Sequence, residues 1–274
     1  MKKILVPTDF SEQAGRALKT AASIARKTGS ELILLHIIDL PQEAMDAVKP
    51  GFDVPEIIFF KNSAEARLSQ TSLSPELNGL TVSQVLRLGR TFDLVNEVAT
   101  ANDVDLIVMG SHGASGFKEV FIGSNTEKVV RTSEIPVLVI KNEETLTSFN
   151  KVVFAVDLGA EVKESTKKMI KFLISNEIKP VFLYVNTPNN FKSTHVADKM
   201  AKEYIQQLSI NDYEFAIYND VDIEKGILNY AESINADLIA MGTHGRTGFA
   251  RLLNGSISED LVNHSSKSVL TFKL

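Results

Sequence analysis

The stretch DLIVMGSHG at residues 105–113 returns as DLIAMGTHG at residues 237–245, an offset of 237 − 105 = 132 residues. The dipeptide Gly-Ser at residues 123–124 recurs at residues 255–256 with the same offset. A repeat of this length is typical of duplicated domains and not of a solenoid, whose repeating units are shorter.

The first strand of each copy is repeated as well. The opening KILVPTD at residues 3–9 corresponds to KVVFAVD at residues 151–157. The 274 residues of the chain are enough for two domains of ordinary size. We therefore expect domains at residues 1–144 and 150–274, joined by a polar linker around residues 142–150.

Each copy alternates apolar strands with amphipathic helices, which is typical of an α/β fold. The apolar runs lack polar alternation, as expected for parallel strands that are covered on both faces. The first helix has one apolar face and is expected to end at Gly29, and a further helix is expected near residues 61–77. We predict two doubly wound, five-stranded parallel-sheet domains. The expected strands are residues 4–6, 31–38, 81–88, 105–109 and 136–140 in the first copy and 151–156, 180–185, 212–218, 237–241 and 268–273 in the second.

Composition narrows the classes of function. The net charge is −5, so we expect neither a nucleic acid nor a membrane as a partner. The absence of cysteine excludes disulfides, thiolate nucleophiles and cysteine-held metals. The apolar run from Ile4 to Val6 is too short for the core of a signal peptide, and no stretch approaches the length of a membrane span. We expect a cytoplasmic protein.

Two loops of each copy are expected to meet at the carboxyl ends of the strands, where doubly wound sheets bind their ligands. In the first copy these loops are residues 7–9, after the first strand, and the glycine turn at residues 110–113, after the fourth. Glycines allow a backbone to approach a phosphate closely. The pattern therefore favours a ligand at this edge of the sheet.

A helix is expected to begin beside each glycine turn. Ser124-x-x-Glu127 matches a capping box with Ser124 as the N-cap, and Ser256-x-x-Glu259 repeats it. A helix start presents unpaired N–H groups and the positive end of the helix dipole, which suits a bound anion.

The pattern Gly-x-x-Gly, nine residues and then Gly-Ser, placed between a strand and a capped helix, resembles the nucleotide-binding signature of the universal stress protein family. KILVPTDFS at residues 3–11 resembles the first strand of that family, and the resemblance covers nearly the whole chain in two copies. It implies a Rossmann-like, adenine nucleotide alpha hydrolase-like fold with strand order 3-2-1-4-5. It also implies a regulatory stress-response module that binds ATP, or AMP or ADP, with Mg²⁺ as a companion of the phosphates.

Carried over residue by residue, the resemblance implies a nucleotide site in the first copy. Asp9 would hold the ribose hydroxyls, Ile37 would contact the adenine, and residues 123–126 would bind the phosphate tail. Met109 borders the pocket through packing, and His112 is expected to be a neighbour of the phosphates and not an acid or base. The implied set is Pro7, Thr8, Asp9, Ile37, Met109, Gly110, His112, Gly113, Gly123, Ser124, Asn125 and Thr126.

The second copy carries a matching but altered set. It departs from the family at Ala155-Val156, where Pro-Thr would be expected, and it has Arg246 where the first copy has Ala114. An arginine at that position could pair with phosphate. The implied set is Asp157, Val185, Gly242, Gly245, Arg246, Gly255, Ser256, Ile257 and Ser258.

The motifs that the chain lacks favour binding over catalysis. It has no phosphate-binding loop of the Gly-x-x-x-x-Gly-Lys type, no Gly-x-Ser-x-Gly elbow and no His-Glu-x-x-His zinc motif. No catalytic residue and no protein-held metal is therefore assigned. Two alternatives stay open: a weak ATPase or nucleotidyl-transfer enzyme, and a nucleotide-free interaction module.

Simpler roles are open for several of these residues. Asp9 and Asp157 each precede a helix and could act as its N-cap. His36, on an apolar strand, is expected to be a core histidine with a satisfied ring. The last strands, residues 136–140 and 268–273, would be sheet edges that need covering. The family resemblance implies that they pair as an intramolecular pseudo-dimer, and whole chains can form a homodimer.

Overall fold

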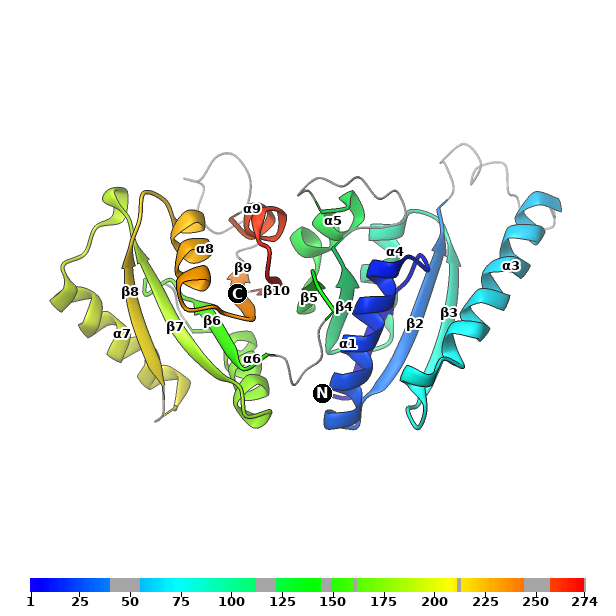
Figure 1. Cartoon of the computed structure of the whole chain (residues 1–274), viewed down its shortest axis with the longest axis horizontal. Helices are drawn as coiled ribbons and strands as arrows, with labels where there is room; N and C mark the ends of the chain where they lie inside the picture. The colour runs from blue at the N-terminus through cyan, green and yellow to red at the C-terminus, as the bar shows by residue number, and fades with distance from the viewer. Residues whose placement is uncertain are drawn as a thin grey trace. The chain divides into compact units, whose positions relative to one another are not determined.

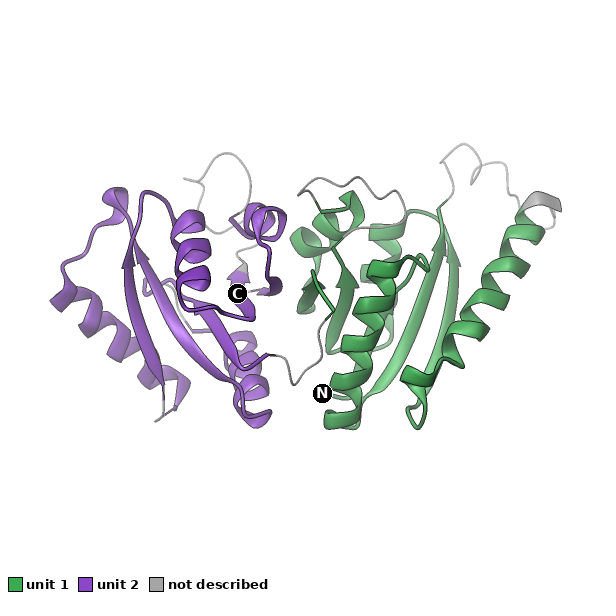
Figure 2. Cartoon of the chain, in the orientation of Figure 1, with its two compact units in different colours: residues 1–146 green, residues 147–274 purple. Residues whose placement is uncertain are grey.

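The chain divides into two compact units, residues 1–146 and 147–274, coloured green and purple in Figure 2. The computed structural model describes residues 1–39, 55–111, 122–143, 149–159, 162–210, 213–243 and 257–273.

The first unit alternates strands and helices as the sequence predicts (Figure 1). Its strands pair in parallel in the order β3-β2-β1-β4-β5, which confirms the expected order 3-2-1-4-5. Its elements are β1 (Lys3–Pro7), α1 (Glu12–Thr28), β2 (Glu31–Ile38), α3 (Pro55–Ser72), the 3₁₀ turn η1 (Pro75–Leu77), β3 (Val82–Leu88), α4 (Thr91–Ala101), β4 (Leu106–Gly110), α5 (Ser124–Thr132) and β5 (Val137–Ile140).

The second unit repeats this winding. Its parallel strands run in the order β8-β7-β6-β9-β10, which is again 3-2-1-4-5 when they are numbered within the unit. Its elements are β6 (Lys151–Ala155), α6 (Glu164–Ser175), β7 (Lys179–Asn186), the 3₁₀ turn η3 (Pro188–Asn190), α7 (Thr194–Leu208), β8 (Glu214–Asn219), α8 (Ile223–Ser233), β9 (Leu238–Thr243), α9 (Ile257–His264) and β10 (Ser268–Lys273).

The first two strands of the units share one register. Pro7 pairs with Leu35 in the first unit, and Ala155 pairs with Leu183 in the second. Both residues of the second pair lie 148 positions after those of the first (155 − 7 and 183 − 35). Residues near these strands can therefore be compared between the units position by position.

Helix α1 is defined by signals at both of its ends. The hydroxyl of Ser11 accepts a hydrogen bond from the N–H of Ala14 at 3.2 Å and so acts as the N-cap. Gly29 adopts a left-handed conformation with φ 69°, and its N–H donates to the carbonyl of Ala25. The helix ends at Thr28, as the sequence predicts.

Helix α3 differs from the helix expected near residues 61–77. It begins at Pro55, ends at Ser72 and is followed by a separate 3₁₀ turn at Pro75–Leu77. Proline suits the first position of a helix because its missing N–H is not needed there. A proline also disfavours helical backbone at the residue before it, and this explains why the helix does not continue through Pro75.

The core of each unit lies on the strands. All five residues of β4 are buried, and Ile4, Leu5 and Val6 of β1 have no exposed surface. Burial of complete apolar runs agrees with parallel strands covered on both faces. None of the described helices combines the length and the apolar character that a membrane-spanning helix needs.

Candidate functional site

Two hydrogen bonds join the end of β4 to the start of α5. The N–H of Gly123 donates to the carbonyl oxygen of Ser111 at 2.8 Å. The hydroxyl of Thr126 donates to the carbonyl oxygen of Gly110 at 3.0 Å, and this bond is buried. The described ends of the glycine turn and of the next helix therefore lie against each other.

The start of α5 differs in detail from the predicted capping box. Gly123 is the N-cap, and it makes no side-chain capping hydrogen bond because glycine has no side chain. Ser124 is the first helical residue and is exposed, so the assignment of Ser124 as N-cap is wrong. The N–H of Glu127 closes the first helical turn by donating to the carbonyl of Gly123 at 3.1 Å. The N–H groups of Ser124 and Asn125 therefore precede the helical ladder and can serve an anion.

Gly110 is required by packing. A Cβ atom at this position would lie 2.8 Å from the carbonyl carbon and oxygen of Gln13 in the first turn of α1. No real Cβ contact is that short, so only glycine allows α1 to approach β4 this closely. The contact places the turn before α1 next to the β4–α5 junction.

The turn after β1 is held by short-range hydrogen bonds. The N–H of Thr8 continues the sheet by donating to Leu35 at 2.8 Å, and the hydroxyl oxygen of Thr8 accepts from the N–H of Phe10 at 3.0 Å. Oδ1 of Asp9 accepts from the N–H of Ser11 at 3.0 Å. Because Ser11 caps α1, the alternative that Asp9 is the N-cap is wrong.

The neighbouring strand β2 contributes Ile37 and His36, both of which are half-buried. His36 Nδ1 lies 2.7 Å from the carbonyl oxygen of Thr8. The carbonyl can only accept, so Nδ1 carries the proton of this bond. The ring nitrogen is satisfied as expected, but the ring lies at the edge of the core, against the turn after β1.

Two residues that the sequence did not single out make contacts at this turn. The ring of Phe10 stacks against His36 with centroids 4.5 Å apart, and the guanidinium carbon of Arg67 lies 4.3 Å from the Phe10 centroid. Phe10 directly follows Asp9 and could have been suspected from that position. Arg67 comes from α3, far away in the sequence, and no sequence signal marks it.

The second unit repeats only part of this arrangement. Oδ1 of Asp157 accepts from the N–H of Gly159 at 2.9 Å, which matches the bond between Asp9 and Ser11. Lys163 is the N-cap of α6, so the alternative that Asp157 caps this helix is also wrong.

Tyrosines lie near Asp157. Burial raises the pKa of Tyr204 to about 12, and the negative charge of Asp157 adds to the shift. The pKa of Tyr184 is raised by the same two causes in the same order. Val185, the expected adenine contact, is buried, and Val185 Cγ1 would be 2.4 Å from a Cβ placed on Gly226.

Of the remaining predicted residues, some are described by the structure and others are not. Met109, Met241 and Ser258 are buried, Gly242 lies within β9, and Ile257 begins α9. Some predicted positions lie outside the described residues: His112, Gly113, Gly245, Arg246, Gly255 and Ser256. Among the described residues, no group of three or more histidines and carboxylates could hold a metal ion.

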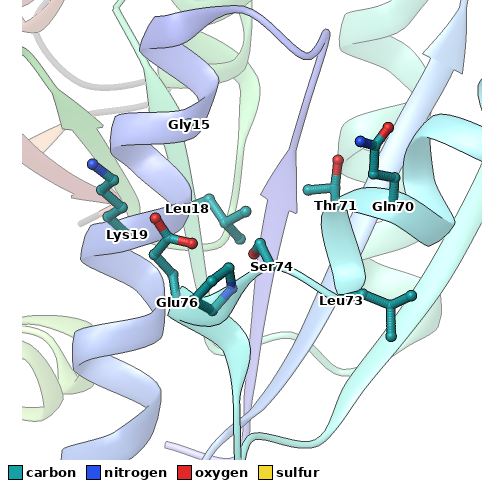
Figure 3. Close-up of a pocket in the computed structure, with 9 residues that line it drawn as sticks. Gly15, Leu18, Lys19, Gln70, Thr71, Leu73, Ser74 and Glu76 are labelled. Carbon is teal, nitrogen blue, oxygen red and sulfur yellow. The ribbon is translucent and has the colours of Figure 1, made fainter.

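A hollow of 610 Å³ lies elsewhere in the first unit (Figure 3). It is bordered by Gly15, Leu18 and Lys19 of α1, by Gln70 and Thr71 of α3, and by residues 73–76, which follow α3 and lead into η1. None of the predicted nucleotide-binding residues lines it. It is a gap between two helices and not part of the junction between β1, β4 and α5.

The order of the strands and the loops at their carboxyl ends define a class: a tandem, doubly wound α/β protein with one candidate ligand site per domain. The model of the universal stress protein family matches residues 1–141 and 148–273. The chain belongs to the universal stress protein family, in a two-domain form.

Individual relatives support both halves. The chain is 34% identical over 157 residues to universal stress protein MJ0577 of Methanocaldococcus jannaschii, covering 53% of this chain and 97% of the relative. It is 26% identical over 297 residues to universal stress protein Slr1230 of Synechocystis, covering 100% of both. The crystal structure of a universal stress protein from Archaeoglobus fulgidus matches with a TM-score of 0.72 and 23% identity, over 99% of this chain and 96% of that one, and supports the fold.

Proposed function

We propose that the chain is a cytoplasmic regulatory module that binds an adenine nucleotide, namely ATP, with AMP or ADP as the alternative ligands. The observation that carries this proposal is the pair of hydrogen bonds that joins β4 to α5, from Thr126 to Gly110 and from Gly123 to Ser111. They hold the amino end of a helix at the carboxyl edge of a parallel sheet, where both geometry and the helix dipole favour phosphate.

The proposed pose follows the sequence resemblance. The phosphates lie at the N–H groups of Ser124 and Asn125, the ribose lies at Asp9, and the adenine lies beside Ile37. Close packing of Gly110 on Gln13 supports this pose, because it brings the turn that carries Asp9 next to the helix start. Mg²⁺ would accompany the phosphates as part of the ligand.

We propose binding without efficient turnover. Phosphoryl transfer requires a cationic clamp, carboxylates for metal and a positioned nucleophile. The described part of the site supplies the Asp9 carboxylate and helix N–H groups. The alternative of a weak ATPase predicts release of phosphate that depends on Asp9, whereas our proposal predicts that bound ATP stays intact for hours.

Calorimetric titration of the Ser124→Asp variant with ATP tests whether phosphate binds at the start of α5. A carboxylate in the first turn suits the helix dipole and so preserves the fold, but it repels phosphate. We expect a loss of at least about tenfold in ATP affinity. Ser193→Asp is the matched control, since Ser193 is the N-cap of α7 and makes no side-chain capping bond. Unchanged ATP binding by Ser124→Asp would refute phosphate binding at α5.

The same family resemblance is our basis for two proposals on assembly. The last strands of the two domains pair as an intramolecular pseudo-dimer, and whole chains associate as homodimers. Light scattering after size exclusion measures the second proposal. A particle with the mass of a single chain at all concentrations tested would contradict it.

A further inference from the structure

The turn that carries Asp9 includes Phe10, whose ring contacts one side chain of β2 and one of α3. The two contacting residues are His36 of β2 and Arg67 of α3. The His36 and Phe10 ring centroids are 4.5 Å apart with planes tilted by 35°, and the Arg67 guanidinium carbon is 4.3 Å from the Phe10 centroid. We call Arg67, Phe10 and His36 the stack. A guanidinium over an aromatic face is an attractive arrangement, so the stack holds Phe10 in one place.

The backbone of Phe10 is unusual. Its φ is +63°, in the left-handed region that large side chains seldom adopt. Such a conformation persists only where the surroundings impose it, and it tends to occur at functional sites. The N–H of Phe10 donates to the hydroxyl of Thr8, and the next N–H, from Ser11, donates to Asp9.

The conformation of Phe10 therefore decides how the chain reverses between Asp9 and helix α1. His36 also holds this turn, through its hydrogen bond to the Thr8 carbonyl. Asp9 lies between Thr8 and Phe10 in the chain, so both contacts act on residues directly beside it.

The second unit provides a natural comparison. With the shared register, Phe10 corresponds to Leu158 (158 − 10 = 148) and His36 corresponds to Tyr184 (184 − 36 = 148). Both residues are buried, and the hydroxyl of Tyr184 donates to the carbonyl of Asn190 at 3.2 Å. Leucine offers no aromatic face, so the second unit cannot form this stack.

We propose that the stack positions Asp9 to bind the ribose hydroxyls of the nucleotide, and that recognition of ribose is a property of the first domain. This inference rests on the proposed function. The members of the stack are positioning residues, because they act through Asp9. Any nucleotide in the second domain would be held mainly by its base and phosphates.

The test measures the affinity of the full chain for ATP and for 2′,3′-dideoxy-ATP, which lacks the hydroxyls that Asp9 would hold. For Phe10→Leu we expect ATP affinity to fall about tenfold, with a change of less than about twofold for the dideoxy nucleotide. Phe10→Tyr keeps the aromatic face and should restore the preference for ATP. In an Asp9→Asn background, Phe10→Leu should add less than about twofold, because the carboxylate it positions is gone.

A second variant tests the stack without changing Phe10, in case Phe10→Leu does not fold. Arg67 is exposed, so Arg67→Met should fold normally and reduce ATP affinity about two- to fivefold, the size of an exposed cation–π contact. Lys61→Met is the matched control on the same helix, and Phe59→Leu is the control for the loss of an exposed ring.

The outcomes separate the two proposals. The role of the stack alone would be overturned if the wild-type chain binds ATP but the two variants show no selective loss. In that case Phe10→Leu and Arg67→Met would bind both nucleotides as tightly as wild type does, or would lose affinity for both equally. A wild-type chain that binds no nucleotide would overturn the proposed function itself.

Discussion

The hydroxyl of Thr126 donates a buried 3.0 Å hydrogen bond to the carbonyl oxygen of Gly110, which ties the first turn of α5 to the end of β4. A threonine near the start of a helix could instead offer its hydroxyl to a phosphate. Here the proton of the hydroxyl is used within the protein. The N–H groups of the first turn therefore provide the main attraction for an anion.

Thr126→Val tests this bond. The change preserves shape but leaves the Gly110 carbonyl without the hydroxyl, so we expect a loss of about 1–2 kcal/mol in the free energy of unfolding. ATP affinity should fall as well, because the helix start is less firmly placed. Thr132→Val, in the last turn of the same helix, removes exposed hydrogen bonds and should cost less than about 0.5 kcal/mol. Urea denaturation of both variants measures the difference.

Gly110→Ala should be destabilising for a steric reason. The new Cβ would lie 2.8 Å from the backbone of Gln13, and separating α1 from β4 should cost about 1–3 kcal/mol. Gly15→Ala, within α1, is the control without a steric clash, because a Cβ at Gly15 would have no atom within 4 Å. That change should stabilise the protein by about 0.5–1 kcal/mol through helix propensity. Equal stabilities of the two variants would contradict the proposed packing.

Tyr204 should make the stability of the second domain fall at alkaline pH. Its pKa rises to about 12 in the folded protein because it is buried, with Asp157 as a smaller cause. The unfolded chain loses this proton near pH 10 while the folded chain keeps it, so stability falls as pH rises from about 10 to 12. Tyr204→Phe should remove roughly 2 kcal/mol of this fall, as chemical denaturation at several pH values would show. An identical pH profile in Tyr204→Phe would exclude Tyr204 as its source.

The parts of the fold that the sequence predicts are those in which strong local signals agree with the global fold. The repeats, the apolar runs and Gly29 predicted the strands, the doubly wound class and the end of α1, and the family resemblance implied the strand order. The bounds of α3 differ from the expected residues 61–77 because Pro55 suits the start of the helix and Pro75 prevents it from continuing. The sequence places the N-cap of α5 one residue too late because Gly123 and Ser124 are both acceptable N-caps.

The stack could not be predicted for a different reason. Arg67 lies on α3, Phe10 in the turn between β1 and α1, and His36 on β2, and only the order of the strands and the packing of α3 bring them together. The left-handed backbone of Phe10 also contradicts the preference of its residue type. A tertiary contact of this kind leaves no periodic or spacing signal in the sequence.

The two aspartates should contribute unequally to ATP binding. Asp9 is oriented by a turn that the stack supports, and Asp157 lies near two tyrosines. We expect Asp9→Asn to lower ATP affinity about tenfold or more and Asp157→Asn to change it less than about threefold. A larger loss in Asp157→Asn, measured by calorimetry, would contradict the assignment of ribose recognition to the first domain.

Native mass spectrometry of the freshly purified full chain, before and after addition of ATP with Mg²⁺, tests nucleotide binding most directly. We predict a species heavier than the bare chain by at least one adenine nucleotide, and we expect Asp9→Asn and Ser124→Asp to lower the fraction of chains that carry it. A spectrum that shows only the bare chain at an ATP concentration far above cellular levels would contradict the account.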